Sequence, residues 1–235
     1  MISVCLATYN GERFIKEQIA SILEQLDKDD ELIISDDGST DYTLSIIQSF
    51  EDERIKIFHN KGKHGVISNF ENALSKAKGD CIFLSDQDDV WMPKKIEICI
   101  KRLQQNILVV HNANIINGEG INNGIDFFSL RKSKEGYWNN IWRNSYLGCC
   151  MCFRSELIQH ILPFPPKIEM HDRWVGLIAQ MYGKVYYEQD CLIGYRVHGN
   201  NVSNSTGKSV NSFGTKLAIR FWLLFYTTCR YLKLS

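Results

Sequence analysis

The sequence Leu84-Ser85-Asp86-Gln87-Asp88-Asp89-Val90-Trp91 gathers three aspartates directly after a short apolar run at residues 81–84. The apolar run is typical of a buried β-strand, and Pro93 favours a helix that starts just after the acids. Carboxylates crowded at a strand end repel one another, so such a group persists where it holds a cation or accepts hydrogen bonds from a ligand. The alternative is capping of the next helix by Asp88 or Asp89.

Outward from this stretch, strand-like apolar runs alternate with segments of helical periodicity through the first half of the chain. We expect strands at residues 2–7, 32–35, 55–58, 81–84 and 107–110, and helices at residues 13–26, 41–50, 66–77 and 93–103. Strands that alternate with helices favour a parallel sheet covered on both faces. The predicted fold class is therefore α/β, and ligands of such sheets bind at the carboxyl ends of the strands.

Two further polar segments follow the first and second predicted strands. They are Thr8-Tyr9-Asn10-Gly11-Glu12 and Asp36-Asp37-Gly38-Ser39-Thr40-Asp41. Because the carboxyl ends of parallel strands meet at one edge, we expect both segments to lie near the acids of residues 86–89. Tyr9 offers an aromatic face for a base, and Glu12 offers a hydrogen-bond acceptor. Packing of Tyr9 within its loop, and helix capping by Thr40 or Asp41, are the plain alternatives.

The second half of the chain is less regular. Residues 113–136 are rich in Asn and Gly and predict loops with edge strands, and residues 146–154 predict a strand. We also expect helices at residues 155–162 and 171–182, strands at 185–187 and 191–197, and a polar loop at 199–212.

The charges are balanced overall but unevenly distributed. Lys and Arg number 27, Asp and Glu number 27, and the formal net charge is zero, which argues against nucleic-acid binding. Residues 191–235, however, contain six basic residues and no acid, and such tails often meet anionic surfaces, including membranes.

Helical periodicity marks the end of this basic segment. Over residues 216–234 the side chains of Lys216, Arg220, Thr227 and Arg230 share one face, and Phe221 and Phe225 lie across from them. The apolar run at 221–226 is too short to span a bilayer. We expect either an interfacial membrane helix or a helix that packs on the domain or on a second subunit.

The eight cysteines do not predict disulfides. Cys5, Cys81 and Cys191 lie in strand-like apolar runs, where cysteine packs as a small hydrophobic residue. Met1 is followed at once by a predicted strand, with no recognisable secretory signal. We therefore expect a reducing, cytoplasmic location.

Taken in order, these segments resemble family 2 glycosyltransferases of the GT-A fold. The resemblance rests on Thr8-Tyr9-Asn10, on residues 36–41 and on Asp86-Gln87-Asp88-Asp89-Val90-Trp91, and it covers residues 1–205. Asn69-Phe70 and LSDQDDVWMPKKI at residues 84–96 are similar to the rhamnosyltransferase-like branch of bacterial surface polysaccharide synthesis. The family implies a Rossmann-like, mostly parallel sheet with helices on both faces and a small antiparallel portion on the acceptor side.

The resemblance implies a set of donor-binding residues. Thr8, Tyr9, Glu12, Asp36 and Asp37 would hold the base and ribose of a nucleotide-diphosphate sugar. Asp88 would bind a divalent metal, Mn²⁺ or Mg²⁺, and Asp86 would contact the ribose or a metal-bound water. Hard oxygen ligands of this kind suit both ions, and the metal would neutralise the charge that builds on the departing diphosphate.

The family position of the catalytic carboxylate falls on Asp172, in the segment Glu169-Met170-His171-Asp172-Arg173-Trp174. Asp172 would take the proton of the acceptor hydroxyl in a single displacement that inverts the anomeric centre. An ordinary Asp is a weak base, so we expect burial or neighbouring charges to raise its pKa. His171, where many relatives carry Glu, is the alternative base, and a helix-dipole role for Asp172 is the plain alternative.

Four more residues are weaker candidates. His198 is expected as a further metal or diphosphate contact and Arg196 as a phosphate contact. Gly148 would allow close backbone approach near the donor. Trp91 would either stack on a sugar or fill the core.

The predicted protein is an inverting, metal-dependent glycosyltransferase of bacterial O-antigen, capsule or other cell-surface polysaccharide synthesis. It would use a UDP- or dTDP-sugar, with dTDP-rhamnose as one candidate, and a lipid-linked oligosaccharide as acceptor on the inner face of the cell membrane. Residues 1–112 would form the nucleotide-sugar half, 113–205 the acceptor and catalytic half, and 206–235 a basic amphipathic tail, with 213–235 contacting the membrane. The alternative is a non-catalytic nucleotide-sugar-binding partner of another transferase. The sugar, the acceptor, the choice of metal and the oligomeric state stay open.

Overall fold

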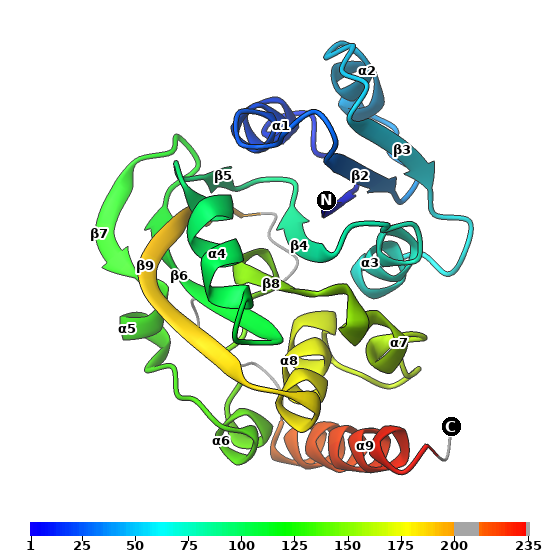
Figure 1. The fold of residues 1–235 in the computed structure, drawn as a ribbon, viewed down its shortest axis with the longest axis vertical. Coiled ribbons are helices and arrows are strands. Elements are labelled where there is room, and N and C mark those ends of the chain that lie inside the picture. Colours follow the sequence, from blue (N-terminus) through cyan, green and yellow to red (C-terminus); the bar gives the residue numbers. More distant parts are fainter. Residues whose placement is uncertain (200–211, 234–235) are drawn as a thin grey trace.

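The structure is a computed structural model that describes residues 1–199 and 212–233 of the chain. One mixed sheet runs through the described residues in the order β3-β2-β1-β4-β8-β6-β9-β5, with β7 paired to β6 (Figure 1). The strands are β1 (Ile2–Thr8), β2 (Glu31–Asp36), β3 (Ile55–His59), β4 (Cys81–Asp86), β5 (Val90–Trp91), β6 (Leu108–Ile116), β7 (Asn122–Asp126), β8 (Met151–Arg154) and β9 (Val185–Arg196). The predicted α/β class is confirmed.

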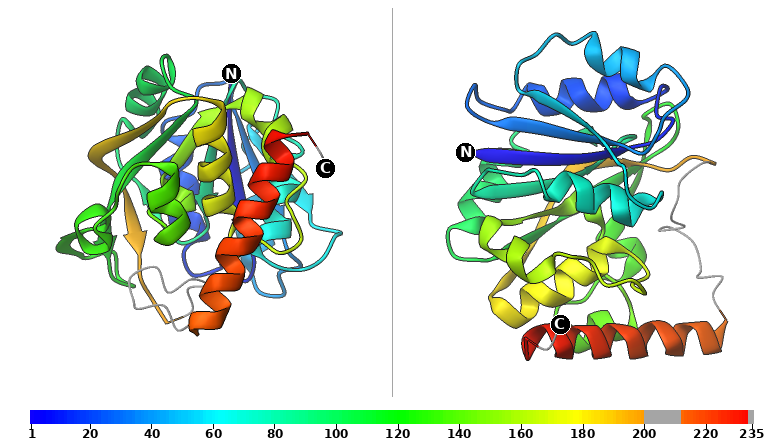
Figure 2. Two further views of the ribbon diagram at one scale, coloured as in Figure 1. Left: turned by 90° about the horizontal axis from the view of Figure 1, so that it is seen from below. Right: turned by 90° about the vertical axis from the view of Figure 1, so that its right-hand side faces the viewer.

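Helices cover both faces of this sheet. One face packs on α1 (Ile15–Leu23), α2 (Thr43–Gln48) and α4 (Lys95–Leu103). The other packs on α3 (Val66–Leu74), α6 (Tyr137–Trp142), α7 (Ile158–Ile161) and α8 (His171–Tyr182). The short helix α5 (Phe127–Arg131) follows β7, and α9 (Phe213–Tyr231) lies outside α8 as a further layer (Figure 2).

The register of the central strands brings the predicted polar segments together. In β1 and β2 every residue except Ile2 is buried, because helices cover both faces of the parallel pair and the middle of each strand is apolar. Parallel pairing aligns Thr8 with Asp36 and Ala7 with Asp86. The loops that follow β1, β2 and β4 therefore leave the sheet at the same edge.

The second half contributes the antiparallel pairs. Strand β8 runs antiparallel between β4 and β6, and β5 and β7 pair antiparallel with β9 and β6. Residues 185–197, expected as two strands, form the continuous strand β9, with shifts of register against His111 and Asn112 of β6. The polar residues 188–190 suggested a break, but the backbone accommodates them at an irregularity of the sheet. The predicted domain boundary at 205/206 lies outside the described residues.

Helix α9 packs on the domain through the face that includes Arg220, Thr227 and Arg230. Thr227 is buried and shares a 2.6 Å hydrogen bond with the hydroxyl of Tyr137. Arg220 donates to the carbonyl of Trp142, and Arg230 donates to the carbonyls of residues 160, 162 and 163. Of the two expectations for this segment, packing on the domain is therefore seen for this face, and membrane contact stays a prediction. Across the described residues, no helix has the length and apolar character needed to cross a bilayer.

Candidate active site at the carboxyl edge of the sheet

The acidic loop after β4 meets the end of β9. The carboxylate Oδ2 of Asp88 lies 2.8 Å from Nε2 of His198, two residues beyond β9. Asp89 is 1% exposed, and its Oδ1 accepts a hydrogen bond from the backbone N–H of Arg196. These contacts hold the acidic loop against the end of β9. The two predicted metal ligands, Asp88 and His198, therefore lie next to each other.

The acids of this loop repel one another strongly. The pKa of Asp86 is raised well above its usual range, first by removal from solvent and then by the carboxylates of Asp89, Asp88 and Asp172. Burial, followed by the charge of Asp88, raises the pKa of Asp89 to about 7. Within the described residues Oδ2 of Asp89 has no hydrogen-bond partner. A bound cation would relieve this repulsion, because it supplies the missing positive charge.

The donor set fits a divalent ion. Asp86, Asp89 and Cys149 each have one ligand atom within 4.8 Å of the others, beside the Asp88–His198 pair. Carboxylate oxygens with one imidazole suit Mn²⁺ and accommodate Mg²⁺. The cysteine sulfur is soft and its thiol pKa is raised by burial, so the oxygens and the imidazole are the better candidate ligands.

Arg196 does not face a phosphate. Its side chain is 2% exposed, and its guanidinium donates to the carbonyls of Asp88 and Gly118 and to Glu17 Oε2 at 2.6 Å. It also stacks on the ring of Phe14. The expectation of a phosphate contact is wrong, because the guanidinium holds the acidic loop and α1 together.

The loop after β1 is fastened to the acidic loop by Gln87. Its amide oxygen accepts hydrogen bonds from Thr8 Oγ1 and from the backbone N–H of Tyr9, and its amide nitrogen donates to the Tyr9 carbonyl. Tyr9 is 54% exposed, so its ring is accessible at this edge. Glu12 accepts from the N–H of Tyr42 at the start of α2, which gives it a capping contact in addition to its predicted role.

Asp36 and Asp37 are both buried and both hydrogen-bonded within the protein. Asp36 accepts from the backbone N–H groups of Gly38 and Ser39 and from the Ser39 hydroxyl, and so shapes the turn after β2. Asp37 accepts from Asn60 Nδ2 at 2.7 Å and from the N–H of Gly65. Contact of either carboxylate with a nucleotide stays a prediction.

Asp172 lies in the first turn of α8 and is 7% exposed. Burial raises its pKa from the ordinary 3.8 to about 6, although a hydrogen bond from the backbone N–H of Arg173 partly offsets this. Its charge in turn raises the pKa of Asp86, so the two carboxylates share one electrostatic environment. Asp172 lies across the turn of Gly148 and Cys149 from these acids. A Cβ at Gly148 would lie 3.7 Å from Cβ of Asp172, and the sulfur of Cys149 lies within 4.8 Å of ligand atoms of Asp86 and Asp89.

His171 and Gly148 are packed against each other. The His171 ring is 2% exposed and stacks on Phe70 at 3.9 Å between ring centroids. Burial lowers the pKa of His171 to about 3, and neither ring nitrogen has a hydrogen-bond partner in the described part of the chain. A Cβ at Gly148 would lie 2.7 Å from His171 Nε2. Gly148 therefore makes room for this ring, and a buried, uncharged His171 is poorly placed to act as the base.

Trp91 fills the core. It is 3% exposed in β5, its ring lies 5.6 Å from that of Phe83, and the ammonium group of Lys95 lies 4.0 Å from its centroid. Of the two expected roles, only core packing fits this position, and the sugar-stacking role is not carried further.

Sequence reasoning missed several residues of this edge. Contacts at this edge also come from four residues whose local sequence does not predict them: Gln87, Cys149, Asn60 and Lys95. Gln87 sits between the acids of the motif, and its position there is the one available signal.

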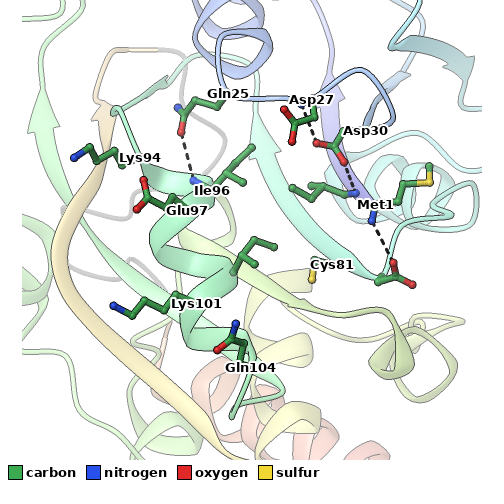
Figure 3. Close-up of a pocket in the computed structure, with 13 residues that line it drawn as sticks. Met1, Gln25, Asp27, Asp30, Cys81, Lys94, Ile96, Glu97, Lys101 and Gln104 are labelled. Carbon is green, nitrogen blue, oxygen red and sulfur yellow. Dashed lines mark hydrogen bonds and ion pairs between the residues drawn. The ribbon is translucent and has the colours of Figure 1, made fainter.

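A hollow of about 820 Å³ lies at the opposite edge of the sheet from the acidic loop. It is lined by Met1, Ile2 and Cys81 at the amino ends of β1 and β4 (Figure 3). It is separate from the candidate site.

Comparisons with known proteins agree with this geometry. The chain is 32% identical over 167 residues to a UDP-Glc:α-D-GlcNAc-diphosphoundecaprenol β-1,3-glucosyltransferase of Escherichia coli, covering 70% of this chain and 64% of that one. It is 30% identical over 213 residues to a dTDP-rhamnosyl transferase of Shigella flexneri, covering 83% and 72%. The chain thus spans less than two thirds of the length of the E. coli relative.

A solved structure confirms the fold type. The mannosyltransferase of Pyrobaculum calidifontis, in complex with GDP-Man and Mn²⁺, superposes with a TM-score of 0.65 at 19% identity, covering 97% of this chain and 64% of that one. The fold is therefore of the GT-A type, as the resemblance implied. The family model described as glycosyl transferase family 2 matches residues 3–162. The chain belongs to glycosyl transferase family 2.

Proposed function

We propose that this chain is an inverting, metal-dependent glycosyltransferase that moves one sugar from a UDP- or dTDP-sugar to a lipid-linked glycan in bacterial surface polysaccharide synthesis. The single observation that supports it best is the Asp88–His198 pair at 2.8 Å, with the buried Asp172 in the same electrostatic environment as Asp86. Relatives named for UDP-Glc and dTDP-rhamnosyl transfer support the donor classes, with dTDP-rhamnose as one candidate. The relative that acts on a diphosphoundecaprenol-linked sugar supports the acceptor class.

Residues 1–112 would bind the donor. Tyr9 would stack on the base, and Thr8, Glu12, Asp36, Asp37 and Asp86 would contact the base or ribose. Asp88 and His198 would hold Mn²⁺ or Mg²⁺, which when bound supplies positive charge opposite the departing diphosphate. The buried Arg196 would keep the acidic loop in place by holding the carbonyl of Asp88.

Residues 113–205 would complete the site with the base. Asp172 accepts the proton of the acceptor hydroxyl, and the oxygen attacks the anomeric carbon from the face opposite the diphosphate. A single displacement of this kind inverts the anomeric centre. The raised pKa suits the role, since a base whose pKa lies near the working pH is both ionised and strong enough to accept a proton.

Residues 213–235 would contact the cytoplasmic face of the cell membrane. The outward side chains of α9 are uncharged, and five of them, Phe213, Leu217, Phe221, Phe225 and Tyr231, are 45–76% exposed. An exposed apolar stripe on a helix that cannot span a bilayer suits shallow insertion at the lipid interface. The helix would hold the enzyme at the surface where a lipid-linked acceptor resides.

A donor screen tests the proposal. Purified protein is incubated with UDP- and dTDP-sugars, with Mn²⁺ or with EDTA, and release of the nucleoside diphosphate is measured. We expect one donor class to be consumed only with the metal. Donor binding without any metal-dependent hydrolysis or transfer would instead favour a nucleotide-sugar-binding protein without catalytic activity.

A further inference from the structure

A buried lysine lies beneath the acidic loop and has no part in the chemistry described so far. Lys95, the first residue of α4, is 0% exposed. Its Nζ donates a 2.8 Å hydrogen bond to the carbonyl of Cys149 and lies 4.0 Å from the centroid of Trp91. Burying an ammonium group is unfavourable unless hydrogen bonds and charges compensate. The hydrogen bond to the Cys149 carbonyl and the face of Trp91 supply such contacts, so Lys95 and the turn that contains Cys149 are tied together.

The carbonyl that Lys95 holds belongs to a turn between the donor acids and the base. This 3₁₀ turn, η1, comprises residues Gly148–Cys150. On one side, the sulfur of Cys149 lies within 4.8 Å of ligand atoms of Asp86 and Asp89. On the other side, a Cβ at Gly148 would lie 3.7 Å from Cβ of Asp172. The turn therefore touches both parts of the candidate site.

We propose that Lys95 is a positioning residue, which holds the turn η1 and thereby sets the separation between the donor acids and Asp172. The inference rests on the proposed function, because it assigns the two sides of the turn to donor and base. Transfer requires the base, the acceptor hydroxyl and the anomeric carbon to be aligned, and a misplacement of about 1 Å can cost roughly 100-fold in rate. Donor binding should change less, because the proposed donor contacts lie on the side of the turn that faces Asp86 and Asp89.

The test separates rate from binding. Lys95→Met keeps the length of the side chain and removes its charge and its hydrogen bond to Cys149. With the donor identified by the screen, we expect kcat to fall at least ~10-fold. The dissociation constant of UDP or dTDP with Mn²⁺, measured by calorimetry, should stay within about threefold, a change below ~1 kcal/mol.

A matched control addresses general destabilisation. Leu103→Ala removes a buried side chain (3% exposed) from the far end of the same helix. It should lower Tm as large-to-small core substitutions do, while kcat stays within about threefold of wild type at a temperature where both variants are folded, since the site geometry is retained. Should Lys95→Met not fold, Lys95→Leu, which also removes both the charge and the hydrogen bond to Cys149, is measured in its place, with the same direction expected.

Three results would overturn the inference. They are an unchanged kcat in the Lys95 variant, an equal loss of kcat and of metal-dependent nucleotide binding, and an equal loss of kcat in Leu103→Ala. A wild-type protein that consumes no donor under any metal condition would instead contradict the proposed function itself. An active wild type with an unaffected Lys95 variant contradicts the positioning role alone.

Discussion

Oδ2 of Asp88 and Nε2 of His198 lie 2.8 Å apart although 110 residues separate them in the chain. The acid follows β4 and the imidazole follows β9. The backbone N–H of Arg196 donates to the carboxylate of Asp89 and fastens the two segments together. A carboxylate and an imidazole brought together at the edge of the sheet suit a divalent cation.

Replacing His198 should weaken metal use without abolishing the fold. In His198→Ala we expect the Mn²⁺ concentration for half-maximal turnover to rise at least ~10-fold, because one ligand of the site is lost. Turnover is measured across a Mn²⁺ titration, with His160→Ala as the control, because this histidine stacks on Tyr182 away from the acidic loop. An unchanged Mn²⁺ dependence would remove His198 from the metal site.

Turnover should depend on the ionisation of Asp172. Since burial raises its pKa to about 6, kcat should fall about tenfold per pH unit below that value. Asp172→Asn should lose at least ~100-fold in kcat while it still binds the nucleotide with metal. The pH–rate profile checks the first expectation, and normal turnover of the Asn variant would exclude Asp172 as the base.

The same substitution should stabilise the protein. Because the folded-state pKa is raised from 3.8 to about 6, ionised Asp172 destabilises the folded state, fully so above pH 6. Asp172→Asn should therefore raise the free energy of unfolding by up to about 3 kcal/mol at pH 8 and by about half of that at pH 5. Urea denaturation at both pH values measures this, and a gain that does not grow with pH would contradict the raised pKa.

Gly148→Ala should disturb the contact between the turn η1 and the start of α8. The added Cβ would overlap His171 Nε2, and overpacking of this kind costs about 1–3 kcal/mol. We expect lower Tm and lower kcat, with partial recovery in the double variant Gly148→Ala/His171→Ala, which removes the overlapping ring. Gly214→Ala serves as the neutral control, because the nearest atom to the added Cβ, Ser212 Oγ, lies 4.0 Å away. No recovery in the double variant would mean that the ring is not the obstacle.

Membrane contact is best tested on the outward stripe of α9. Deleting the helix would uncover the core, since Leu223 is 1% exposed. Phe221→Ser/Phe225→Ser should instead reduce sedimentation with anionic phospholipid vesicles at least ~10-fold at unchanged Tm, because each phenyl group contributes about 2 kcal/mol when fully buried. Tyr42→Ser, an exposed aromatic residue at α2, is the control. Equal sedimentation of all three proteins would refute the contact.

The first half of the fold and the placement of the acids could be predicted from the sequence. Strands buried on both faces are mainly apolar, so the alternation with helices could be recognised in the sequence. Parallel register then brings Thr8, Asp36 and Asp86 to the same edge. Helix α6 was missed because its sequence YWNNIW is poor in strong helix formers.

Other parts of the site depend on tertiary contacts that no local pattern reports. Arg196 pairs with Glu17, 179 residues away, and so turns from the expected phosphate position into the protein. His171 is buried because α3 brings Phe70 against it. Arg220 and Arg230 looked like the solvent face of an amphipathic helix, but main-chain carbonyls of the domain accept their hydrogen bonds.

Calorimetric titration of UDP and dTDP tests the central claim most directly. Wild-type protein should bind at least one of these nucleotides with Mn²⁺, and should bind it at least ~10-fold more weakly with EDTA. Asp88→Ala should lose this metal-dependent gain, whereas Asp29→Ala, an exposed aspartate away from the edge, should retain it. Nucleotide binding that is equally strong with EDTA, or a full metal effect in Asp88→Ala, would contradict a metal-dependent donor site at the carboxyl edge of the sheet.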